Sequence, residues 1–570
     1  MTALDGIPFS KFCTSKDLRR VLLAAGYNRL PSTPKSIKNI VINYSKKEKK
    51  NLVEEIKAMK KAGVKFSLTF DEWTSLRNRR YMNVNLHTAI GSEFQDGSLF
   101  KNIGLVRVDG TMPAETCIRL LKTKLLEFEL SLDRDIVAIT TDGASVMCKV
   151  GRNIEAFHQI CLAHGIHLGV SDVLYRKATT TESTGHDENE TSDDDESEDI
   201  DGDSEKFTFI EVLTPHLNLE YGGVIKKTRS VIKMFLRSPT KNDALQKYVR
   251  EQEGRDLVLV LDCKTRWSSL ADMIERFNRL KMCIEKTLID FNSAIKFSQE
   301  EFALLNSIQK SLKIVKITVE ALCRRDATLL TAEAALKYML RKLDNLETSL
   351  SKSLAEALRK RISERRQPLT AVLQYLHNPK EYFKENAETL RVNNPEFPRM
   401  SCDEMITSIA ELLQRLQEQT LHSLALQNKG AMSSPDGTHA SAEKETSDDD
   451  TSTGSSNSTV MEKELNKAIE QSMTKKQNRP QIGEIGEEEE DNIKTLIRIE
   501  MTLHENGGTR GRFLDAAYKY LLGIPPTSVE SERAFSAASY LCNKIRSSLN
   551  DASLEALCFL RSIFQQTRSA

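Results

Sequence analysis

Alternating hydrophobic and polar residues mark strands in the first quarter of the chain. In Val64–Trp73, every second residue up to Phe70 is hydrophobic, which is the period of two that a strand with two different faces produces. Met82–His87 alternates in the same way, and Ile103–Asp109 has the pattern of a third strand. A turn-like basic cluster at 77–80 follows the first stretch, and glycines follow the other two. The sequence therefore predicts an antiparallel meander of three strands.

A helix and an uninterrupted apolar run follow the meander. Pro113–Phe128 places hydrophobic residues three and four positions apart, as one face of a helix requires. Ile136–Ile139 is apolar throughout and leads to Asp142, a pattern typical of a central parallel strand. If this fourth strand pairs with the first, Asp71 and Asp142 lie side by side at the strand ends. From its own stretch alone, Asp71 could equally be the cap of a turn.

Two adjacent carboxylates repel each other unless a cation lies between them. Oxygen ligands with open positions suit Mg²⁺ or Mn²⁺, and pairs of such ions stabilise the attacking and leaving oxygens in phosphoryl transfer. The pattern therefore predicts a site for two divalent ions and requires a third acid from elsewhere in the chain.

The rest of the chain is predicted to be mainly helical. Leu257–Asp262 has the apolar pattern of another buried strand, and a capping-box pattern at Thr527–Glu530 opens a helix near the C-terminus. The predicted division of the chain is a helical N-terminal region (1–62), the first part of an α/β core (63–178), an acidic disordered insertion (179–206), the continued core (207–268), a helical insertion (269–428), a low-complexity disordered linker (429–492) and the end of the core with a C-terminal helical region (493–570).

Composition favours a soluble intracellular protein with a polyanionic partner. The ten cysteines include no Cys-x-x-Cys pair, the N-terminus has no secretion signal, and no apolar run reaches the ~18–20 residues of a membrane span. The net charge is zero, but residues 182–205 carry thirteen acids, 443–450 carry five acids and Lys444, and 484–491 carry six acids. Without these stretches the remainder carries about +23, which fits nucleic-acid binding, although a solvated basic surface is the simpler alternative.

A group of histidines and a cysteine follows the fourth strand. His158, Cys161, His164 and His167 are metal-ligating residue types, but on one helix their ends would lie about 13.5 Å apart. All four cannot bind one ion. We therefore favour core packing or a nucleic-acid contact over a zinc site.

Five short motifs in one order resemble the hAT superfamily of DNA transposases. The motifs are Thr69–Thr74, Thr141–Ala144, Cys161–His164, Thr265–Ser269 and Pro526–Ser536. The resemblance implies an α/β fold in which a ribonuclease H-like catalytic core is interrupted by a large all-helical insertion and followed by a helical C-terminal hAT dimerisation segment.

The resemblance also assigns roles to individual residues. The catalytic acids and ligands of two Mg²⁺ (or Mn²⁺) ions would be Asp71, Asp142 and Glu532. The predicted DNA contacts are Trp267, Arg266, Arg77, Arg79, Arg80 and His164. Trp267 would stack on DNA near the cut, with core packing as the alternative, and a solvated turn is the alternative for the three arginines at 77–80. The predicted dimerisation residues are Phe535, Leu554, Leu557 and Leu560.

Two functions follow from these expectations. The first is a nuclear, homodimeric transposase that cuts and joins DNA, with no membrane and no small-molecule substrate. The second is a domesticated, catalytically inactive DNA-binding and dimerisation protein, and another ribonuclease H-like nuclease is a third, weaker option. Family members of this kind commonly begin with a BED-type zinc finger, whereas no such cysteine and histidine pattern precedes Asp71. Whether the finger is missing from the gene model or lost stays open, as does recognition of transposon ends.

Overall fold

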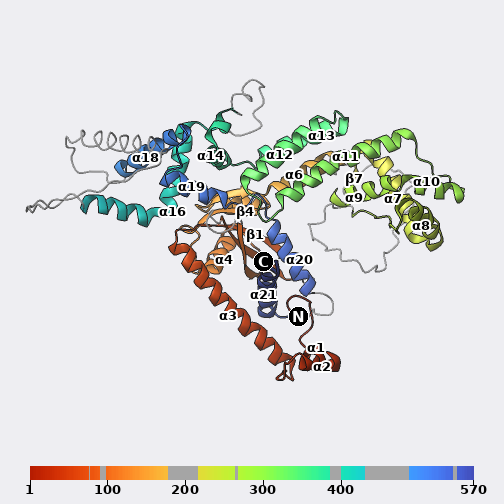
Figure 1. Ribbon diagram of the computed structural model, residues 1–570, viewed down its shortest axis with the longest axis horizontal. Coiled ribbons are helices and arrows are strands. Elements are labelled where there is room, and N and C mark those ends of the chain that lie inside the picture. The colour runs from red at the N-terminus through yellow and green to blue at the C-terminus, as the bar shows by residue number, and fades with distance from the viewer. Residues whose placement is uncertain are drawn as a thin grey trace, which may run out of the picture.

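The computed structural model describes residues 1–75, 78–89, 98–176, 216–263, 267–384, 400–430, 487–542 and 549–569. It is a mixed α/β structure, mostly helical, with a small mixed sheet. Figure 1 shows the sheet near the centre, with helices extending from it on both sides. The predicted acidic insertion (179–206) and most of the predicted linker (429–492) lie outside the described residues.

The sheet has five strands in the order β3-β2-β1-β4-β5. Their bounds are β1 (Phe66–Thr74), β2 (Arg80–Ala89), β3 (Ser98–Val108), β4 (Ile136–Thr141) and β5 (Phe157–Ile160). β1, β2 and β3 pair antiparallel, whereas β4 lies parallel to both β1 and β5. The predicted meander is therefore confirmed, and the fourth strand is indeed the parallel neighbour of the first. A separate pair, β6 (Tyr175–Arg176) and β7 (His216–Leu217), is antiparallel.

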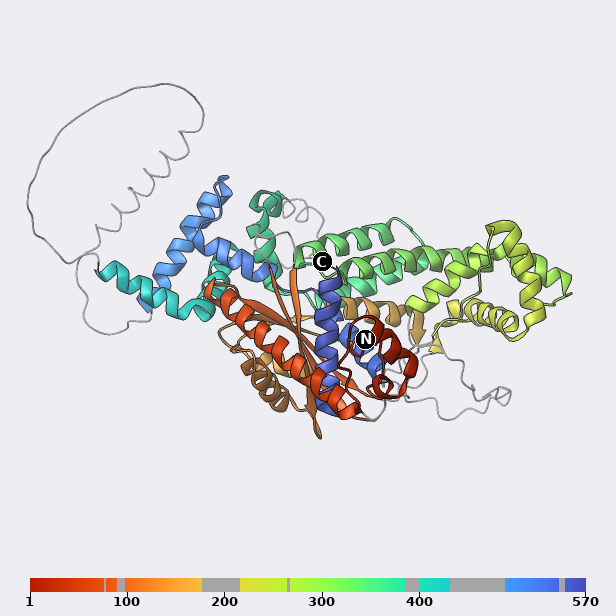
Figure 2. The ribbon, with the colours of Figure 1, turned by 60° about the horizontal axis from the view of Figure 1, so that its bottom comes forward.

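Helices from both ends of the chain cover the apolar face of the sheet. They are α3 (Pro34–Lys61), α4 (Ala114–Leu126) and α21 (Asp551–Ser569). Leu52 and Leu121 belong to the same buried cluster as Leu68 of β1 and Leu557 of α21. α3 is one long helix of the predicted helical N-terminal region, and it begins after a Thr33 cap with Pro34 in its first turn. Figure 2 shows α3 and α21 crossing the sheet. α1 (Lys11–Thr14) and α2 (Lys16–Ala24) precede α3, and α5 (Ser145–Arg152) follows β4.

A second group of helices packs beside β4. It consists of α14 (Pro368–His377), α16 (Cys402–Gly430), α18 (Glu487–Glu505) and α19 (Arg512–Leu522). Their buried residues, among them Leu373 and Leu413, form one cluster with Val137 and Ala138 of β4. In addition, Arg415 donates to the carbonyl oxygens of Ile136 at 2.7 Å and Val137 at 2.8 Å. The later part of the predicted helical insertion is therefore packed on the sheet.

The remaining helices form an extended unit that we call the helical arm, meaning α6 to α13. They are α6 (Leu162–Leu174), α7 (Leu219–Arg237), α8 (Pro239–Glu253), α9 (Trp267–Arg279), α10 (Lys281–Asp290), α11 (Gln299–Leu322), α12 (Leu329–Asp344) and α13 (Ser349–Ser363). All contribute to a single apolar core, and the arm extends to the right in Figure 1. α7 and α8, which the sequence assigned to the continued core, thus pack in the arm.

Small residues join α6 to α13. A Cβ added at Gly165 would lie 2.5 Å from the Arg365 side chain, and one at Gly169 would lie 2.9 Å from Leu358. Only glycine therefore permits this close approach, which fixes α6 at the base of the arm.

The strand predicted at Leu257–Asp262 is wrong. This segment is extended but pairs with no strand, and its apolar side chains are largely exposed apart from Leu259, which is 3% exposed. The Gln246 side chain instead binds both backbone groups of Leu257, at 3.0 and 3.3 Å. The segment lies in the helical arm, where Asp262 forms an ion pair with Arg229 of α7.

A buried cation joins three helices on the apolar face. Lys124 of α4 is 2% exposed and contacts Glu555 of α21 at 2.7 Å and Glu127 at 2.9 Å. Lys49 of α3 contacts the same Glu555 at 2.7 Å. Burial works to lower the pKa of Lys124, but the two glutamates outweigh it and raise this pKa. The charge of Glu555 is therefore needed to hold α21 against α3 and α4.

We expect Glu555→Ala to reduce the free energy of unfolding by about 2 kcal/mol, because it leaves a buried ammonium group with one partner fewer. Urea unfolding followed by circular dichroism measures this loss. The matched control is Glu54→Ala, which removes an exposed ion pair with Lys57 (3.1 Å) and should cost no more than about 0.5 kcal/mol. Equal losses in the two variants would contradict the role of Glu555.

Candidate functional site

Asp71 and Asp142 lie where β1 and β4 separate. The last parallel pair of these strands is Thr69 with Thr140, and each aspartate follows two residues later. Because a step of two residues keeps side chains on the same face, the two carboxylates are on one face of the sheet. The charge of Asp142 raises the pKa of Asp71, so they are within electrostatic range of each other.

Local backbone geometry holds both carboxylates. Asp71 accepts a hydrogen bond from the Glu72 N–H at 2.7 Å, and Asp142 accepts one from the Ala144 N–H at 2.9 Å. Gly143 has φ +88°, and a Cβ there would lie 2.6 Å from Ile160. The chain can therefore turn this sharply after Asp142 only with glycine.

The third acid, Glu532, reaches this region through contacts that we call the C-terminal clamp. Thr140 donates to the Pro525 carbonyl at 2.9 Å, and the Leu162 N–H donates to the Pro526 carbonyl at 3.1 Å. The Ser528 N–H donates to the Cys161 sulfur at 3.4 Å. These contacts fix the segment that precedes α20 (Val529–Leu541), so Glu532 stands in the first turn of a helix that covers the sheet.

The three acids share one electrostatic environment. Burial and the charge of Asp142 raise the pKa of Asp71 to about 8, and Glu532 adds to this rise, while the Glu72 N–H opposes it. In the part of the chain that the structure describes, however, no three His, Cys, Asp or Glu side chains are grouped closely enough to hold a metal ion. The three acids thus face one region of the sheet, but they do not form a complete metal-binding site.

The residues present suit a hard divalent cation in their chemistry. Carboxylate oxygens are the donors that Mg²⁺ and Mn²⁺ prefer, and a cation would relieve the repulsion that raises the pKa of Asp71. Asn83 lies opposite Asp71 in the β1–β2 register, is fully buried, and has no partner among the described residues for either polar side-chain atom. A hydrated cation would suit both groups. Its charge would offset that of the Asp71 carboxylate, and its water would bind the Asn83 amide.

The predicted Cys-x-x-His pair lies beside this acidic site. Burial of His164 lowers its pKa, and Asp142 opposes the shift. His158 shares a 2.8 Å hydrogen bond with Thr141, and the His164 and His167 rings stack at 6.1 Å. With Cys161 engaged in the C-terminal clamp, these residues pack and connect elements, as the sequence analysis favoured over zinc.

The arginines after β1 are not free for DNA in this structure. Arg79 forms an ion pair with Asp551 at 3.0 Å, and Arg80 forms a two-pronged ion pair with Glu72. Each side chain therefore holds two parts of its own chain together, and its contact with DNA stays a prediction. Arg77 lies outside the described residues.

Trp267 is a core residue. It opens α9 in the helical arm, is 5% exposed, and belongs to the apolar cluster of that arm. Its ring therefore offers no face to a base, so core packing replaces the predicted stacking on DNA. Arg266 lies outside the described residues.

The residues predicted for dimerisation fill the core of their own chain. Leu554, Leu557 and Leu560 are at most 3% exposed and pack on the sheet, and Phe535 stacks on Trp73 at 6.1 Å. Within one chain these side chains therefore pack in the core, and their place in a dimer interface stays a prediction.

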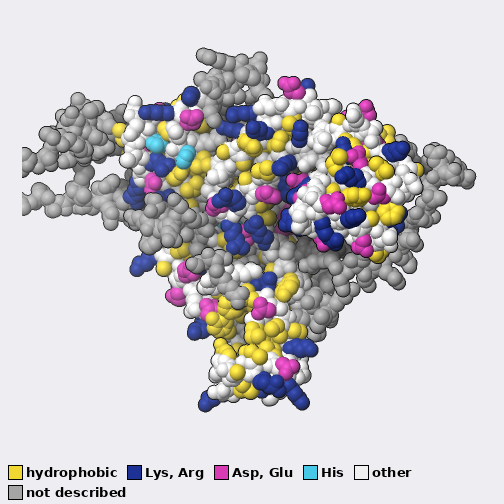
Figure 3. Space-filling view, turned by 45° about the vertical axis from the view of Figure 1, so that its right-hand side comes forward, with side chains coloured by type: hydrophobic (Ala, Val, Ile, Leu, Met, Phe, Trp, Pro, Cys, Tyr) yellow, Lys and Arg dark blue, Asp and Glu magenta, His cyan; other side chains and the backbone are white. Residues whose placement is uncertain are grey.

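Exposed apolar side chains lie elsewhere, on α2 and α3 and the loop between them. Figure 3 shows hydrophobic side chains gathered on the lower part of the molecule, where Figure 1 places these helices. The exposed residues are Val21, Leu23, Tyr27, Ile40 and Tyr44. Tyr44 also stacks on Phe564 of α21 at 6.0 Å, so this surface is continuous with the C-terminal helix.

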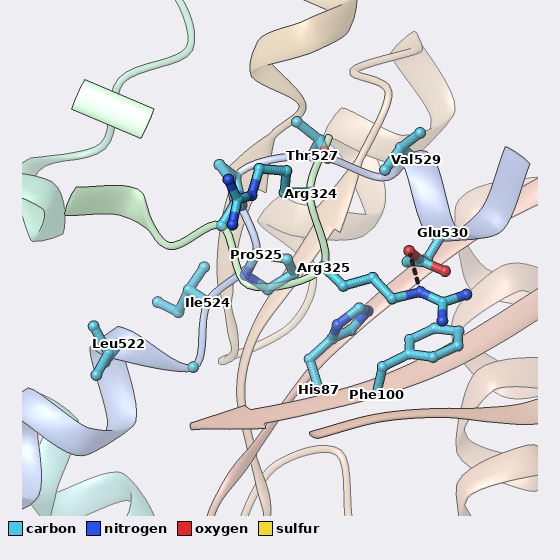
Figure 4. A pocket seen from close by; sticks show the side chains of 13 residues that line it. His87, Phe100, Arg324, Arg325, Leu522, Ile524, Pro525, Thr527, Val529 and Glu530 are labelled. Atoms are coloured by element: carbon cyan, nitrogen blue, oxygen red, sulfur yellow. Dashed lines mark hydrogen bonds and ion pairs between the residues drawn. The ribbon is translucent and has the colours of Figure 1, made fainter. Parts of the chain in front are cut away.

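A pocket missed by sequence reasoning lies between the helical arm and the sheet. His87 and Phe100 form its floor, and Arg324, Arg325 and Glu530 line its sides (Figure 4). Arg325 contacts Glu530 at 3.1 Å, and its guanidinium lies 5.1 Å from the Phe100 ring centroid. The signal in the sequence was the Arg-Arg pair at 324–325, which sits within an otherwise regular helical pattern.

Exposed basic groups surround the buried Glu530. Arg533 contacts Glu530 and also donates to the Cys323 carbonyl at 2.9 Å. The side chains of Arg324, Arg325 and Arg533 are 67%, 46% and 45% exposed. Glu530 faces two of these arginines, and Arg324 pairs with Asp326 at 2.6 Å, so each exposed guanidinium group next to α20 has an acidic partner.

The structure thus combines a mixed sheet, which carries carboxylates on one face, with a helical C-terminal segment. Residues 513–564 match the family model of the hAT family C-terminal dimerisation region. This match supports an hAT-family transposase-like protein with a region for homo-oligomerisation, and it confirms the resemblance seen in the motifs. A comparison with curated proteins finds no match. Among the described helices, none has the length and apolarity to cross a membrane.

Burial of His87 should make stability depend on pH. Burial lowers its pKa to about 3, whereas an unfolded histidine titrates near pH 6.5. The unfolded chain therefore takes up the proton first, so the stabilisation is complete above about pH 6.5 and is lost as the pH falls towards 3. Between pH 7 and pH 5, the wild type should lose about 2 kcal/mol more than His87→Gln. Urea unfolding at both pH values checks this difference, and parallel profiles would contradict it.

Proposed function

We propose that this chain is a hAT-like DNA transposase that cleaves DNA and transfers the cut strand in the nucleus, acting as a homodimer. The observation that carries the proposal is that Asp71, Asp142 and Glu532, which lie far apart in the sequence, face one region of the sheet in a chain with a hAT dimerisation region. The order of an antiparallel meander, a crossover helix and a parallel strand supports a ribonuclease H-like core.

Asp71, Asp142 and Glu532 would hold one or two Mg²⁺ or Mn²⁺ ions. Such ions, when bound, stabilise charge on the attacking and leaving oxygens of phosphoryl transfer. The Glu72 and Ala144 N–H groups orient the two aspartates, and the C-terminal clamp sets the position of Glu532. Because α20 carries Glu532 and the clamp precedes it, a small shift of this helix would bring the glutamate into or out of the site.

The exposed arginines supply the electrostatics that DNA requires. Arg324, Arg325 and Arg533 lie beside the helix that carries Glu532, so a phosphate backbone bound to them passes next to the acids. Phosphate contacts of this kind fix the position of DNA without reading its sequence. They replace Arg79 and Arg80 as the proposed path of the DNA.

The absence of a finished metal cage in the described residues supports a second candidate, a domesticated protein that binds DNA and dimerises without catalysis. In that case the three acids would be retained for structure, and the arginines would keep their contact with DNA.

Asp142→Asn should lower Mg²⁺-dependent DNA cleavage at least about 100-fold, because it removes one of the proposed ligands. The substrate is duplex DNA carrying the sequences that flank the gene, and the readout is strand breaks on a denaturing gel. Asp133→Asn is the matched control, because Asp133 precedes the same strand at its other end and pairs with Lys122 at 3.2 Å. Binding of this DNA by the wild type without any cutting would favour the second candidate.

Arg324→Gln should weaken DNA binding equally for unrelated sequences and lower the salt dependence of binding by about one unit in slope. The control is Arg250→Gln, since Arg250 is exposed and paired with an aspartate as Arg324 is, but lies in α8 in the helical arm. Fluorescence anisotropy at several salt concentrations measures both variants. An unchanged salt slope for Arg324→Gln would place the DNA elsewhere.

A further inference from the structure

Asn83 is a buried polar residue of the acidic face with nothing to bind. It lies in β2 directly opposite Asp71 of β1, and residues opposite each other in an antiparallel pair share a face. It is 0% exposed. In the described part of the chain, neither its Nδ2 nor its Oδ1 has a hydrogen-bond partner. A buried amide left in this state is costly, so the folded chain keeps it against a penalty.

The neighbours of Asn83 along its strand are already engaged. The Asn85 amide donates to Thr69 and Ser531, both at 3.2 Å, and accepts from Asn102 at 2.7 Å. The Tyr81 hydroxyl donates to an Asp551 carboxylate oxygen at 2.8 Å. The residues paired with Asn83 on the neighbouring strands are Leu105, which has no polar side-chain atom, and Asp71 of the acidic site.

The chemistry of an amide limits what could satisfy both ends. Its Oδ1 needs a donor and its Nδ2 needs an acceptor. A bare cation would satisfy only Oδ1, and a second carboxylate only Nδ2, whereas a water molecule does both. A hydrated divalent cation, such as Mg²⁺, which keeps several of its waters in protein sites, brings such molecules together with the charge that the carboxylates require.

We propose that Asn83 is a positioning residue of the acidic site, whose side-chain amide hydrogen-bonds the water shell of a divalent cation held by the carboxylates. This inference rests on the proposed function, because it takes the acids as cation ligands. Asn83 would act through water rather than by touching DNA, and it would determine how the hydrated cation sits against Asp71. Outer partners of this kind typically change metal affinity about 10–100-fold.

The test is the binding of Mn²⁺ to the full-length chain in the absence of DNA, measured by calorimetry. Asn83→Leu, of similar size and without polar atoms, should fold as well as the wild type because it removes an unsatisfied group, and it should bind Mn²⁺ about tenfold or more weakly. Asn83→Ala is the second variant, with the same expectation. Circular dichroism establishes that both variants are folded.

Two controls make the result specific. Ser67→Ala removes a buried hydroxyl that, like the Asn83 amide, has no partner in the described residues. Ser67 is on the same strand as Asp71 but opposite His87. This variant should leave Mn²⁺ affinity within about twofold of the wild type. Asp142→Asn removes one of the proposed ligands. The Mn²⁺ that this variant still binds therefore measures the contribution of acidic stretches elsewhere in the chain.

The outcomes separate the two proposals. A folded Asn83→Leu or Asn83→Ala that binds Mn²⁺ as tightly as the wild type would overturn the role of Asn83 and leave the carboxylate site intact. A wild type that binds no more Mn²⁺ than Asp142→Asn would overturn the cation site itself, and the role of Asn83 with it.

Discussion

The C-terminal clamp is the constraint on which the site depends. Thr140 and Pro525 are 385 residues apart in the sequence and are joined by a hydrogen bond, and Cys161 and Ser528 by another. Closing so long a loop has an entropic cost that these few contacts alone do not offset. The burial of α20 and α21 against the sheet supplies the rest, so Glu532 can join Asp71 and Asp142 only when the C-terminal segment is packed on the sheet.

The clamp lies against an unusual layer of buried polar groups. One face of β1 and β2 carries Thr69, Asn85 and His87, and the first turn of α20 adds Ser531 to the same network. A hydrophobic interface would bind α20 more strongly, since each buried polar group must be satisfied. The chain accepts this cost where the acids lie, as expected if the layer serves a site rather than stability.

The helical arm also returns to this site. The turn between α11 and α12 carries Arg324 and Arg325 to the edge of the sheet, and Arg325 meets Arg533 at the buried Glu530. The arm and the C-terminal segment are thereby coupled at one carboxylate next to Glu532. Whatever binds the exposed guanidinium groups would act on the helix that carries the third acid, which gives a long insertion a direct connection to the chemistry.

The sequence by itself determined the strands and the resemblance to a family. Alternation in Val64–Trp73 predicted β1, the apolar run at Ile136–Ile139 predicted a central parallel strand, and the motifs indicated a hAT relative. Such patterns are local and follow from periodicity. Tertiary structure alone decided which side chains stay available. Trp267, Leu557 and Arg80 were expected to contact partners, and the tertiary structure shows that the folded chain already engages them, because burial and ion pairing depend on contacts between distant segments. Asn83 is the opposite example, because the sequence pattern assigned it no role. Only the strand register shows that its amide is buried without a partner opposite Asp71.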